Sequence, residues 1–293
     1  MNGHAMPLSY HARLVGDLLR TDAYERALRR LVRPGDVVLD VGAGSGILSL
    51  LAARRGARVH AVESMPVARL AAALAARHGL PITVHEQDLC AMAPIEPVDL
   101  VVSDFLGCFL VDDGMLPAIA AAAAWARPAA RYCPSRVRLY VAPVGDFSLP
   151  AIEQWREPLY GLDLSLAEEQ ALGELFPGNL PPSALLAPPA LFATFVPPGP
   201  APRFDASLAF AIERPGRLRA LAGWFEADLA EEVTLSTAPG FETHWGQQLF
   251  ALPEVEVAAG EVVRCRLWLD ERWRWQGTIG ERPFAIVGSE AQP

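Results

Sequence analysis

The chain has 293 residues, of which 52% are hydrophobic and 20% are charged, so it is long enough for two domains with ordinary buried cores. Its formal net charge of −9 argues against a general nucleic-acid-binding protein, because phosphate contacts need a basic surface. We find no signal-peptide pattern, no run of 18 apolar residues and no metal-ligand spacing among the four cysteines, so we expect no membrane anchor, no metal and a reducing, cytoplasmic location.

Residues 8–31 carry apolar side chains at helical spacing, among them Leu14 and Leu18. The pattern predicts an amphipathic segment, which we divide into two helices. Asp17 and Arg20 lie three positions apart and can therefore share one helix face. The spacing alone favours a solvated surface pair, so a functional role for these two residues needs support from elsewhere in the chain.

The run VVLDVGAGSGILSLL, which begins at Val37, combines a buried strand, a glycine turn and the start of a helix. Asp40 lies near the end of the strand. Three glycines follow at alternate positions: Gly42, Gly44 and Gly46. Such a turn lets the backbone approach a ligand closely and directs helix amides toward it. A dinucleotide fingerprint would require a further glycine where Ile47 stands, so the spacing favours an S-adenosylmethionine (SAM) loop.

The next predicted strand spans residues 58–63 and ends in Glu63. An acid at this point of an open α/β sheet can accept hydrogen bonds from both hydroxyls of a ribose. The alternative is a tight strand-to-helix turn with a solvated Glu63. We prefer the ligand interpretation because the glycine loop, the helix after it and the acid agree with one another.

Ser64 can cap a helix over residues 65–77, and a short strand is predicted over residues 81–86. Asp88 follows this strand at the carboxyl edge of the sheet, where ligands bind in open α/β folds. It can accept from the amino group of an adenine, or it can be an ordinary turn residue. Residues 98–103 are mainly apolar, which predicts a strand buried on both faces. The alternation of strands and helices predicts a parallel, doubly wound sheet.

Two acids flank an apolar loop that follows the last of these strands: Asp104 at its start and Asp113 near its end. The loop leaves the sheet at the carboxyl edge, where a methyl donor would lie. Loop acids are usually solvated, but these two share a segment with several phenylalanines and leucines, which suggests a partly desolvated pair. A helix is predicted next over residues 116–125, and it ends before Pro128.

Beyond Tyr132 the pattern changes to short apolar runs separated by glycine and proline, which indicates a β-sandwich or barrel. Within it, residues 151–175 form a helical excursion, and residues 177–202 are mostly loop because they are rich in proline. A loop near the end places His244 beside Trp245, a pair that is by itself more often structural than catalytic. The predicted strands cover residues 139–143, 191–196, 207–212, 218–225, 233–237, 248–252 and 262–268.

Taken in order, these features resemble the protein arginine methyltransferases. The resemblance rests on VLDVGAGSGILSL, the glutamate that ends the second strand, the SDFLGCFLVDDGML loop and the THW motif around His244. It runs from about His11 to Leu269, and THW is its most specific element. It implies an α/β, Rossmann-like SAM-dependent methyltransferase domain, followed by a β-barrel or sandwich domain with an inserted helical dimerisation arm at residues 151–175.

The resemblance also implies an organisation into three parts and a set of partners. Residues 1–33 would be helices that cover the cofactor, residues 34–138 the SAM-binding domain and residues 139–293 the barrel domain. The expected cofactor is SAM, with S-adenosyl-L-homocysteine (SAH) as product. The expected acceptor is arginine or another guanidine, and the expected assembly is a homodimer, with neither nucleic acid nor membrane as a partner.

Individual residues receive roles from the same resemblance. Arg20 matches the ligand of the methionine carboxylate of SAM, Glu63 matches the ribose ligand, and Asp17 matches an acid that pairs with His244. The implied cofactor-binding residues are His11, Arg20, Asp40, Gly42, Gly44, Gly46, Glu63, Ser64, Asp88 and Leu89. The implied catalytic residues are Asp104, Asp113, His244 and Asp17. The implied acceptor-binding residues are Asp104, Asp113, His244 and Trp245.

The two loop acids depart from the family pattern. Asp104 and Asp113 fall on two glutamates, and each lacks one methylene, so either the loop lies closer to the acceptor or the acceptor differs. Asp112 is adjacent to the second position, but the gap-free match through Met115 favours Asp113. The tyrosine-rich helix start of the family is largely missing, with Ala5 near one such tyrosine, so the number of methyl groups transferred stays open.

Three hypotheses for the function remain. We favour N-methylation of the guanidine of arginine, either free or in a peptide or protein, in bacterial specialised metabolism, because the composition is typical of high-GC bacteria. The second hypothesis is a SAM-dependent methyltransferase for another amine or hydroxyl acceptor, which only the two aspartates support. The third is a non-catalytic SAM-binding module, against which the retained glycine loop, Glu63 and THW argue.

Overall fold

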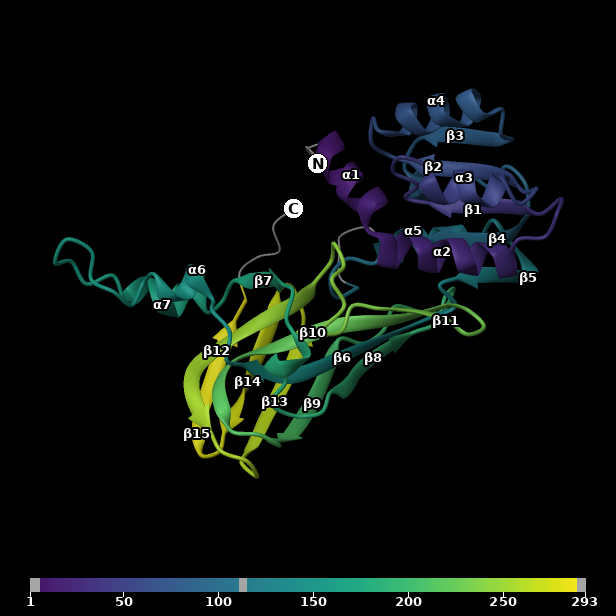
Figure 1. Ribbon diagram of the computed structural model, residues 1–293. Coiled ribbons are helices and arrows are strands. Elements are labelled where there is room, and N and C mark those ends of the chain that lie inside the picture. Colours follow the sequence, from purple (N-terminus) through teal and green to yellow (C-terminus); the bar gives the residue numbers. More distant parts are fainter. Residues whose placement is uncertain (1–5, 111–114, 289–293) are drawn as a thin grey trace. The chain divides into compact units, whose positions relative to one another are not determined.

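The structure is a computed structural model that describes residues 6–110 and 115–288 (Figure 1). The chain divides into two compact units. Unit 1 comprises Met1–Val137, Phe195–Ala201 and Glu226–Ser236, and unit 2 comprises Arg138–Thr194, Pro202–Phe225 and Thr237–Pro293. Unit 1 is built on a parallel sheet and unit 2 on antiparallel strands.

The parallel sheet of unit 1 has the strand order β3-β2-β1-β4-β5. All five residues of β1 are buried, as expected for a central strand with neighbours on both sides. Val41, at the end of β1, lies opposite Val62 of β2 and Ser103 of β4, so the residues that follow these three strands meet at one edge. The order confirms the predicted Rossmann-like sheet. The strands are β1 (Val37–Val41), β2 (Arg58–Glu63), β3 (Ile82–Glu86), β4 (Val98–Ser103) and β5 (Ala126–Cys133).

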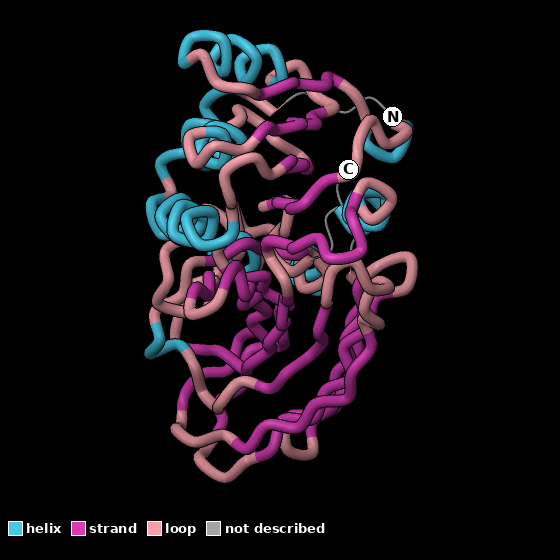
Figure 2. The backbone as a smooth tube through the Cα atoms, turned by 90° about the vertical axis from the view of Figure 1, so that its right-hand side faces the viewer, coloured by secondary structure: helices cyan, strands magenta, loops and turns pink. Residues whose placement is uncertain are grey.

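Helices pack against this sheet, and Figure 2 shows them in cyan beside the strands. The N-terminal segment forms two helices, as predicted, and Asp17 separates them. Gly79 ends α4 in the left-handed conformation that favours glycine at a helix C-cap. The helices of unit 1 are α1 (Leu8–Gly16), α2 (Leu18–Leu31), α3 (Ile47–Ala53), α4 (Ala68–His78), α5 (Met115–Ala122) and the short 3₁₀-helix η1 (Leu89–Ala91).

Two local predictions in unit 1 are wrong. Ser64 does not cap α4, because that helix begins only at Ala68, after a turn in which the Ala68 amide donates to the Met65 carbonyl. The helix expected over residues 116–125 is shorter, and Pro128 lies inside β5. β5 tolerates a proline because it lies at the edge of the sheet, where a missing N–H leaves no inner ladder bond unmade.

Unit 2 contains the predicted barrel-like assembly of antiparallel strands, which curve around a shared interior in Figure 2. One sheet has the order β7-β12-β10-β6-β8, and the other has the order β15-β14-β13-β9. β10 continues into unit 1, where its end pairs with β11 (Val233–Ser236). The strands are β6 (Arg136–Gly145), β7 (Leu175–Gly178), β8 (Ala190–Phe195), β9 (Asp205–Ala211), β10 (Gly216–Ala230), β12 (Gln247–Val257), β13 (Val262–Leu269), β14 (Trp273–Ile279) and β15 (Arg282–Val287), and η2 (Pro182–Ala184) precedes β8.

Aromatic side chains hold the two sheets of unit 2 together. The indole nitrogen of Trp275 in β14 donates to the carbonyl of Ala251 in β12 at 2.7 Å, and the ring of Phe250 meets Trp273 and Trp275 edge to face. Edge-to-face pairs of this kind contribute about 0.5–1.5 kcal/mol beyond the burial of their area. The strands β7, β14 and β15 were not predicted from the sequence.

The helical excursion over residues 151–175, called the arm below, contains α6 (Pro150–Glu153) and α7 (Leu166–Ala171). Its base packs on the barrel through Leu149, Ile152 and Ala171, which belong to a buried cluster with Trp224. The rest of the arm extends away from the strands of unit 2 (Figure 1). Among all the described helices, none is both long and apolar enough to cross a membrane.

Candidate active site

The glycine loop joins β1 to α3 at the carboxyl edge of the parallel sheet. Gly42, Gly44 and Gly46 have φ angles of 69°, 55° and 84°, which L side chains rarely adopt. Gly46 also has no room for a side chain, because a Cβ atom there would lie 2.8 Å from the Cβ of Ala71. The sequence-predicted turn is therefore confirmed as one that glycine alone fits comfortably.

Glu63 lies at the end of β2, beneath this loop. Its Oε2 accepts a hydrogen bond from the Gly44 amide at 2.9 Å, and its Oε1 accepts one from the Met65 amide at 2.8 Å. A carboxylate has about four acceptor sites, so each oxygen can still accept from a ligand hydroxyl. The acid is thus held in a fixed direction by the backbone of the loop that it is expected to share with a cofactor.

Asp40 is a buried carboxyl at the base of the loop. Ser49 in α3 donates to its Oδ2 at 2.6 Å, and its Oδ1 has no hydrogen-bond partner in the described structure. The pKa of Asp40 is raised to about 7, mainly by burial and to a lesser extent by the negative charge of Asp104. The Ser49 hydrogen bond acts in the opposite direction and lowers this pKa. Near neutral pH this group can therefore gain or lose a proton.

His11 in α1 is buried beside the same loop. Its Nδ1 lies 3.5 Å from the position that a Cβ atom on Gly44 would take, and it has no hydrogen-bond partner among the described residues. Two buried polar atoms next to the glycine loop, on His11 and Asp40, are thus unsatisfied. Buried polar groups are normally paired, so their location fits a polar ligand that contacts this loop.

The other predicted cofactor residues lie after β2 and β3. Asp88 is exposed, and its Oδ1 caps η1 by accepting from the Cys90 amide at 2.9 Å, which leaves Oδ2 for a ligand. Leu89 is buried, whereas Ser64 is exposed in the turn before α4. These residues follow the carboxyl ends of adjacent strands, in agreement with a common ligand edge.

Arg20 and Asp104 form a largely buried ion pair that was not predicted from the sequence. The Nε of Arg20 donates to Oδ2 of Asp104 at 2.6 Å, its Nη2 donates to the same oxygen, and its Nη1 donates to the Leu14 carbonyl at 3.0 Å. The side chains of Arg20 and Asp104 are 3% and 13% exposed. Burial is the largest single effect on Arg20 and opposes its ionisation, but the charge and the hydrogen bonds of Asp104, together with weaker contributions from Tyr24 and Asp17, raise the pKa of the guanidinium.

Asp17 does not form a solvated surface pair with the side chain of Arg20. It is the N-cap of α2, and its Oδ1 accepts from the backbone amide of Arg20 at 3.0 Å. The side chain of Arg20 instead crosses to Asp104. The expectation that Asp17 and Arg20 face each other along one helix is therefore wrong in its geometry.

Tyr24 is a site residue that the sequence analysis missed. It is fully buried in α2, its hydroxyl donates to the Ser103 carbonyl at 2.8 Å, and the guanidinium of Arg20 lies over its ring at 5.9 Å. Burial raises the pKa of Tyr24 well above its usual range. The signal was present in the sequence, because residues four apart on a helix share one face, and Tyr24 follows Arg20 at that interval.

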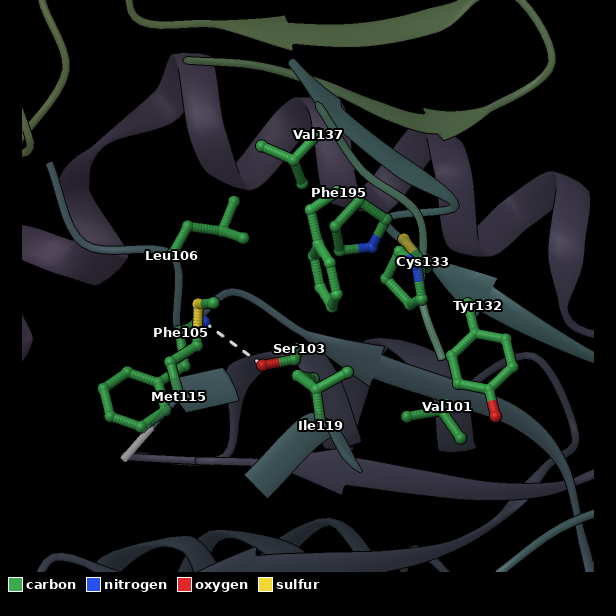
Figure 3. Close-up of a pocket in the computed structure, with 12 residues that line it drawn as sticks. Val101, Ser103, Phe105, Leu106, Met115, Ile119, Tyr132, Cys133, Val137 and Phe195 are labelled. Carbon is green, nitrogen blue, oxygen red and sulfur yellow. Dashed lines mark hydrogen bonds between the residues drawn. The ribbon is translucent and has the colours of Figure 1, made fainter. Parts of the chain in front are cut away.

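The loop after β4 carries Asp104 over an apolar floor. Phe105 packs against the glycine loop, 3.5 Å from the position of a Cβ atom on Gly42, and Leu106 and Phe109 are buried. Figure 3 shows the small pocket below, where the side chains of Leu106, Met115 and Phe195 face one another. Its apolar lining does not suit a guanidinium. Asp113, the second predicted acid, lies outside the described residues.

His244 and Trp245 lie in a loop of unit 2 before β12. Their rings are 3.9 Å apart, and Trp245 is buried edge to face against Phe225 at 5.2 Å. Trp245 therefore acts first as an anchor for this loop and orients the neighbouring imidazole. The described part of the chain contains no cluster of three or more side chains that could hold a metal ion.

Comparisons with known proteins give a consistent family. Residues 135–277 match the arginine methyltransferase oligomerization subdomain, and residues 38–129 match a methyltransferase domain. Protein arginine N-methyltransferase 6 of Xenopus laevis is 32% identical over 268 residues, which cover 84% of this chain and 79% of that protein. The arginine N(omega)-methyltransferase of Streptomyces achromogenes subsp. streptozoticus is 34% identical over 281 residues, which cover 89% of this chain and 76% of that protein.

Solved structures share the fold. An open conformation of protein arginine methyltransferase 10 from Arabidopsis thaliana matches with a TM-score of 0.77 at 25% identity, over 94% of each chain. The Trypanosoma brucei PRMT1 enzyme-prozyme heterotetrameric complex with AdoHcy matches with a TM-score of 0.85, over 94% of this chain and 96% of that chain. The latter likeness, at 24% identity, concerns the fold alone.

Proposed function

The chain belongs to the protein arginine N-methyltransferase family, and from this premise we propose how its own residues carry the reaction. The enzyme transfers a methyl group from SAM to a guanidine nitrogen of arginine. The observation that carries the proposal is the position of Asp104, a nearly buried acid at the carboxyl edge of the sheet, next to the glycine loop. We assign the acceptor guanidinium to Asp104, together with Asp113.

For the cofactor, we assign the ribose hydroxyls to Glu63 and the adenine to Asp88 and Leu89. The glycine loop with Gly42, Gly44 and Gly46 approaches the cofactor with its backbone, beside Asp40 and Ser64. His11 and Arg20, from the helices of residues 1–33, cover the methionine part, with Arg20 at its carboxylate. The unsatisfied atoms of His11 and Asp40 support this assignment, because a ligand with polar groups would pair them.

The electrostatic task of the site is set by two cations. SAM supplies the methyl group from a positively charged sulfonium. The acceptor guanidinium is also charged, and two unit charges ~4 Å apart repel by about 4 kcal/mol at an effective dielectric of 20. Asp104 and Asp113 offset this repulsion and orient the planar guanidinium, which leaves one nitrogen free to attack. Positioning and electrostatics thus carry most of the catalysis.

A proton must leave the guanidinium when the methyl group arrives. We assign this proton to the loop acids or to His244 acting with Asp17. The packing of His244 on the buried Trp245 supports a fixed direction for the imidazole. Trp245 itself contributes to the acceptor side by anchoring this loop.

The test is incubation of the purified protein with methyl-labelled SAM and free arginine, arginine-containing peptides or simple amines, followed by mass analysis. We expect label on a guanidine nitrogen of at least one arginine-bearing acceptor and none on the amines. Label on an amine or a hydroxyl, or no transfer by a protein that binds SAM, would contradict the proposal.

The size of the acceptor is a separate question. One relative is named for protein arginine and another for arginine itself. The shorter side chains of Asp104 and Asp113 favour an acceptor that enters more deeply, and free arginine or a short peptide can do so more easily than a protein segment. We therefore propose a higher kcat/KM for free arginine or a short peptide than for a protein substrate in the same assay.

We propose that the protein acts as a homodimer through the arm. Tyr160, at the tip of the arm, is 95% exposed, and Leu159 and Leu162 are also exposed. Unit 1 carries a second apolar patch, where Leu18 and Leu19 are exposed on α2. Exposed apolar patches of this kind mark protein interfaces, and the match to an oligomerization subdomain agrees with one. Light scattering at micromolar concentration should report a dimer, and a monomer would refute this assembly.

The proposed location is the cytoplasm. The structure describes all four cysteines as free thiols, and Cys133 and Cys265 are buried. Burial raises the pKa of the Cys265 thiol to about 12, so this group stays protonated and unreactive. Free thiols are typical of reducing compartments.

A further inference from the structure

The two helices of the arm are too short to fix the direction of the arm by themselves. α6 has four residues and α7 has six, whereas isolated helices below ~12–15 residues are marginal in water. Beyond the buried base at Leu149 and Ile152, the exposed side chains of Leu159 and Tyr160 contribute little apolar packing to the arm. Besides this buried base, which also includes Ala171, polar contacts with the barrel are therefore needed to set the direction of the exposed part of the arm.

A β-bulge lies on the barrel below the arm. Leu218 and Ala220 are two positions apart in β10, but their partners Val255 and Ala251 are four positions apart in β12. The extra residues of β12 include Pro253, which has no N–H to donate to the ladder. Bulges bend a strand and redirect its side chains.

Glu254 is the acid that this bulge presents, and Arg219 is the residue of β10 that lies across from it. Nη2 of Arg219 is 3.0 Å from Oε2 of Glu254, and Nη1 of Arg219 donates to Glu153 at the end of α6. The side chain of Arg219 is only 9% exposed. Nη1 of Arg217 adds a further bond to Oε1 of Glu254 at 3.2 Å. Arg217, Arg219 and Glu254 are called the charged socket below.

Arg156 connects the socket to both legs of the arm. Its Nε donates to Oε1 of Glu168 in α7 at 2.7 Å, and its Nη1 donates to Oε2 of Glu254. The hydrogen bond to Glu254, more than the opposing effect of burial, raises the pKa of the Arg156 guanidinium. One guanidinium thus ties the turn after α6 to α7 and to β12.

We propose that the charged socket is a positioning device: it fixes the direction of the arm through Arg156 and Glu153 and thereby sets the strength of self-association. Three arginines and three glutamates balance one another across the arm and the barrel, so loss of one member leaves the partly buried network with one unbalanced charge. The effect on self-association rests on the proposed homodimer, whereas the effect on the order of the arm does not.

The experiment uses the full chain with Glu254→Gln, Arg156→Gln and the double variant. Amide hydrogen exchange over residues 151–175 measures the order of the arm, and sedimentation at serial dilution measures the dimer Kd. Charge-assisted hydrogen bonds contribute about 1.5–3 kcal/mol, so each single variant should speed exchange and raise Kd by ~10-fold or more. In the double variant, the fold-changes in exchange rate and in Kd should be smaller than the products of the fold-changes in the two single variants.

The matched control is Asp205→Asn. Asp205 accepts from Arg203 and Arg266 on the other sheet of unit 2, an ionic cluster that does not reach the arm, so this variant should leave exchange in the arm and Kd unchanged. The proposal is overturned if the single variants leave arm exchange unchanged, if their effects simply multiply, or if Asp205→Asn acts as they do. A wild-type chain that is monomeric throughout would refute the homodimer, while the exchange measurement would still decide on the socket.

Discussion

Arg20 and Asp104 contact each other although the proposal assigns them to different ligands. The two hydrogen bonds that Arg20 donates to Asp104 both fall on Oδ2, so neither occupies the Oδ1 that we assign to an acceptor guanidinium. Arg20 also fixes the orientation of the Asp104 carboxylate. This orientation is important because the short side chain of aspartate can reach few alternative positions. At the scale of single residues, one ion pair thus joins the residue proposed for the cofactor, Arg20, to the residue proposed for the acceptor, Asp104.

Asp104→Asn should lower kcat/KM for the acceptor by ~10- to 150-fold, because a charge-assisted hydrogen bond contributes about 1.5–3 kcal/mol. The affinity for SAH should not weaken, since Arg20 loses a competing partner. The variant should also unfold more easily, because a buried ion pair that loses one partner costs about 3–5 kcal/mol. Steady-state kinetics, calorimetric titration with SAH and denaturant unfolding check the three parts.

Wild-type kcat/KM in a folded Asp104→Asn protein would remove Asp104 from the acceptor site. The companion test is the double variant Asp104→Glu with Asp113→Glu. We expect it to be less active, because an added methylene at each acid crowds a pocket that is built around the shorter side chains. Equal or higher activity on arginine peptides would show that the aspartates do not determine specificity.

Asp40 predicts a pH dependence of stability. Its pKa is raised by burial to about 7 from a usual 3.8, so the folded chain holds a proton that the unfolded chain releases. This stabilisation is complete below pH ~4 and is lost as pH rises through about 7, at up to about 1.4 kcal/mol per pH unit. The side-chain amide in Asp40→Asn does not titrate, so the stability of this variant does not fall with that of the wild type. Its unfolding free energy should therefore rise relative to that of the wild type as pH increases from 5 to 7. Parallel pH profiles of the two proteins in denaturant unfolding would contradict this prediction.

At the scale of elements, the turn between β1 and α3 depends on backbone conformations that side chains disfavour. Gly44→Val should abolish SAM binding, because a β-branched residue is strained at a φ of 55° and its side chain would enter the space where the loop backbone is proposed to meet the ligand. The measurement is calorimetric titration with SAM on protein that circular dichroism shows to be folded.

Gly79→Ala is the matched control for this turn. Gly79 also has a positive φ, of 61°, but it caps α4 and a Cβ atom there would meet nothing within 4 Å. This variant should lose about 1 kcal/mol of stability and keep its SAM affinity. If Gly44→Val leaves the SAM affinity unchanged, or if Gly44→Val and Gly79→Ala lose SAM affinity equally, the loop does not approach the cofactor.

At the scale of the whole molecule, the exposed apolar tip of the arm is the surface that we propose for the homodimer interface. Leu159→Ser with Leu162→Ser should give monomers at concentrations where the wild type is dimeric, because interface energy concentrates in a few apolar anchors. Leu191→Ser, at an exposed leucine of β8 outside the arm, should leave the assembly unchanged. Light scattering of the three proteins decides, and dimers in the double serine variant would place the interface elsewhere.

The sequence by itself determined the parts of this protein that depend on local patterns. The glycine turn, the acid at the end of β2 and the buried strand before Asp104 were predictable, because backbone conformation and hydrophobic period are written in neighbouring residues. Short apolar runs separated by glycine and proline also predicted the β-rich second part and its helical excursion, and the resemblance added the expectation that this excursion is a dimerisation arm. The helix start at Ser64 and the helix end at residue 125 were predicted wrongly, and the strand around Pro128 was not predicted, because a cap and an edge strand depend on what lies beside them.

Only the tertiary structure decided which distant residues meet. Arg20 and Asp104 are 84 positions apart, and Arg156 and Glu254 are 98 apart, so no periodicity along the chain could pair them. The same holds for the unsatisfied atoms of His11 and Asp40, which become significant only when burial removes water from both. Charges and polar groups acquire their energies from desolvation and from the partner that folding supplies, and both are properties of the packed molecule.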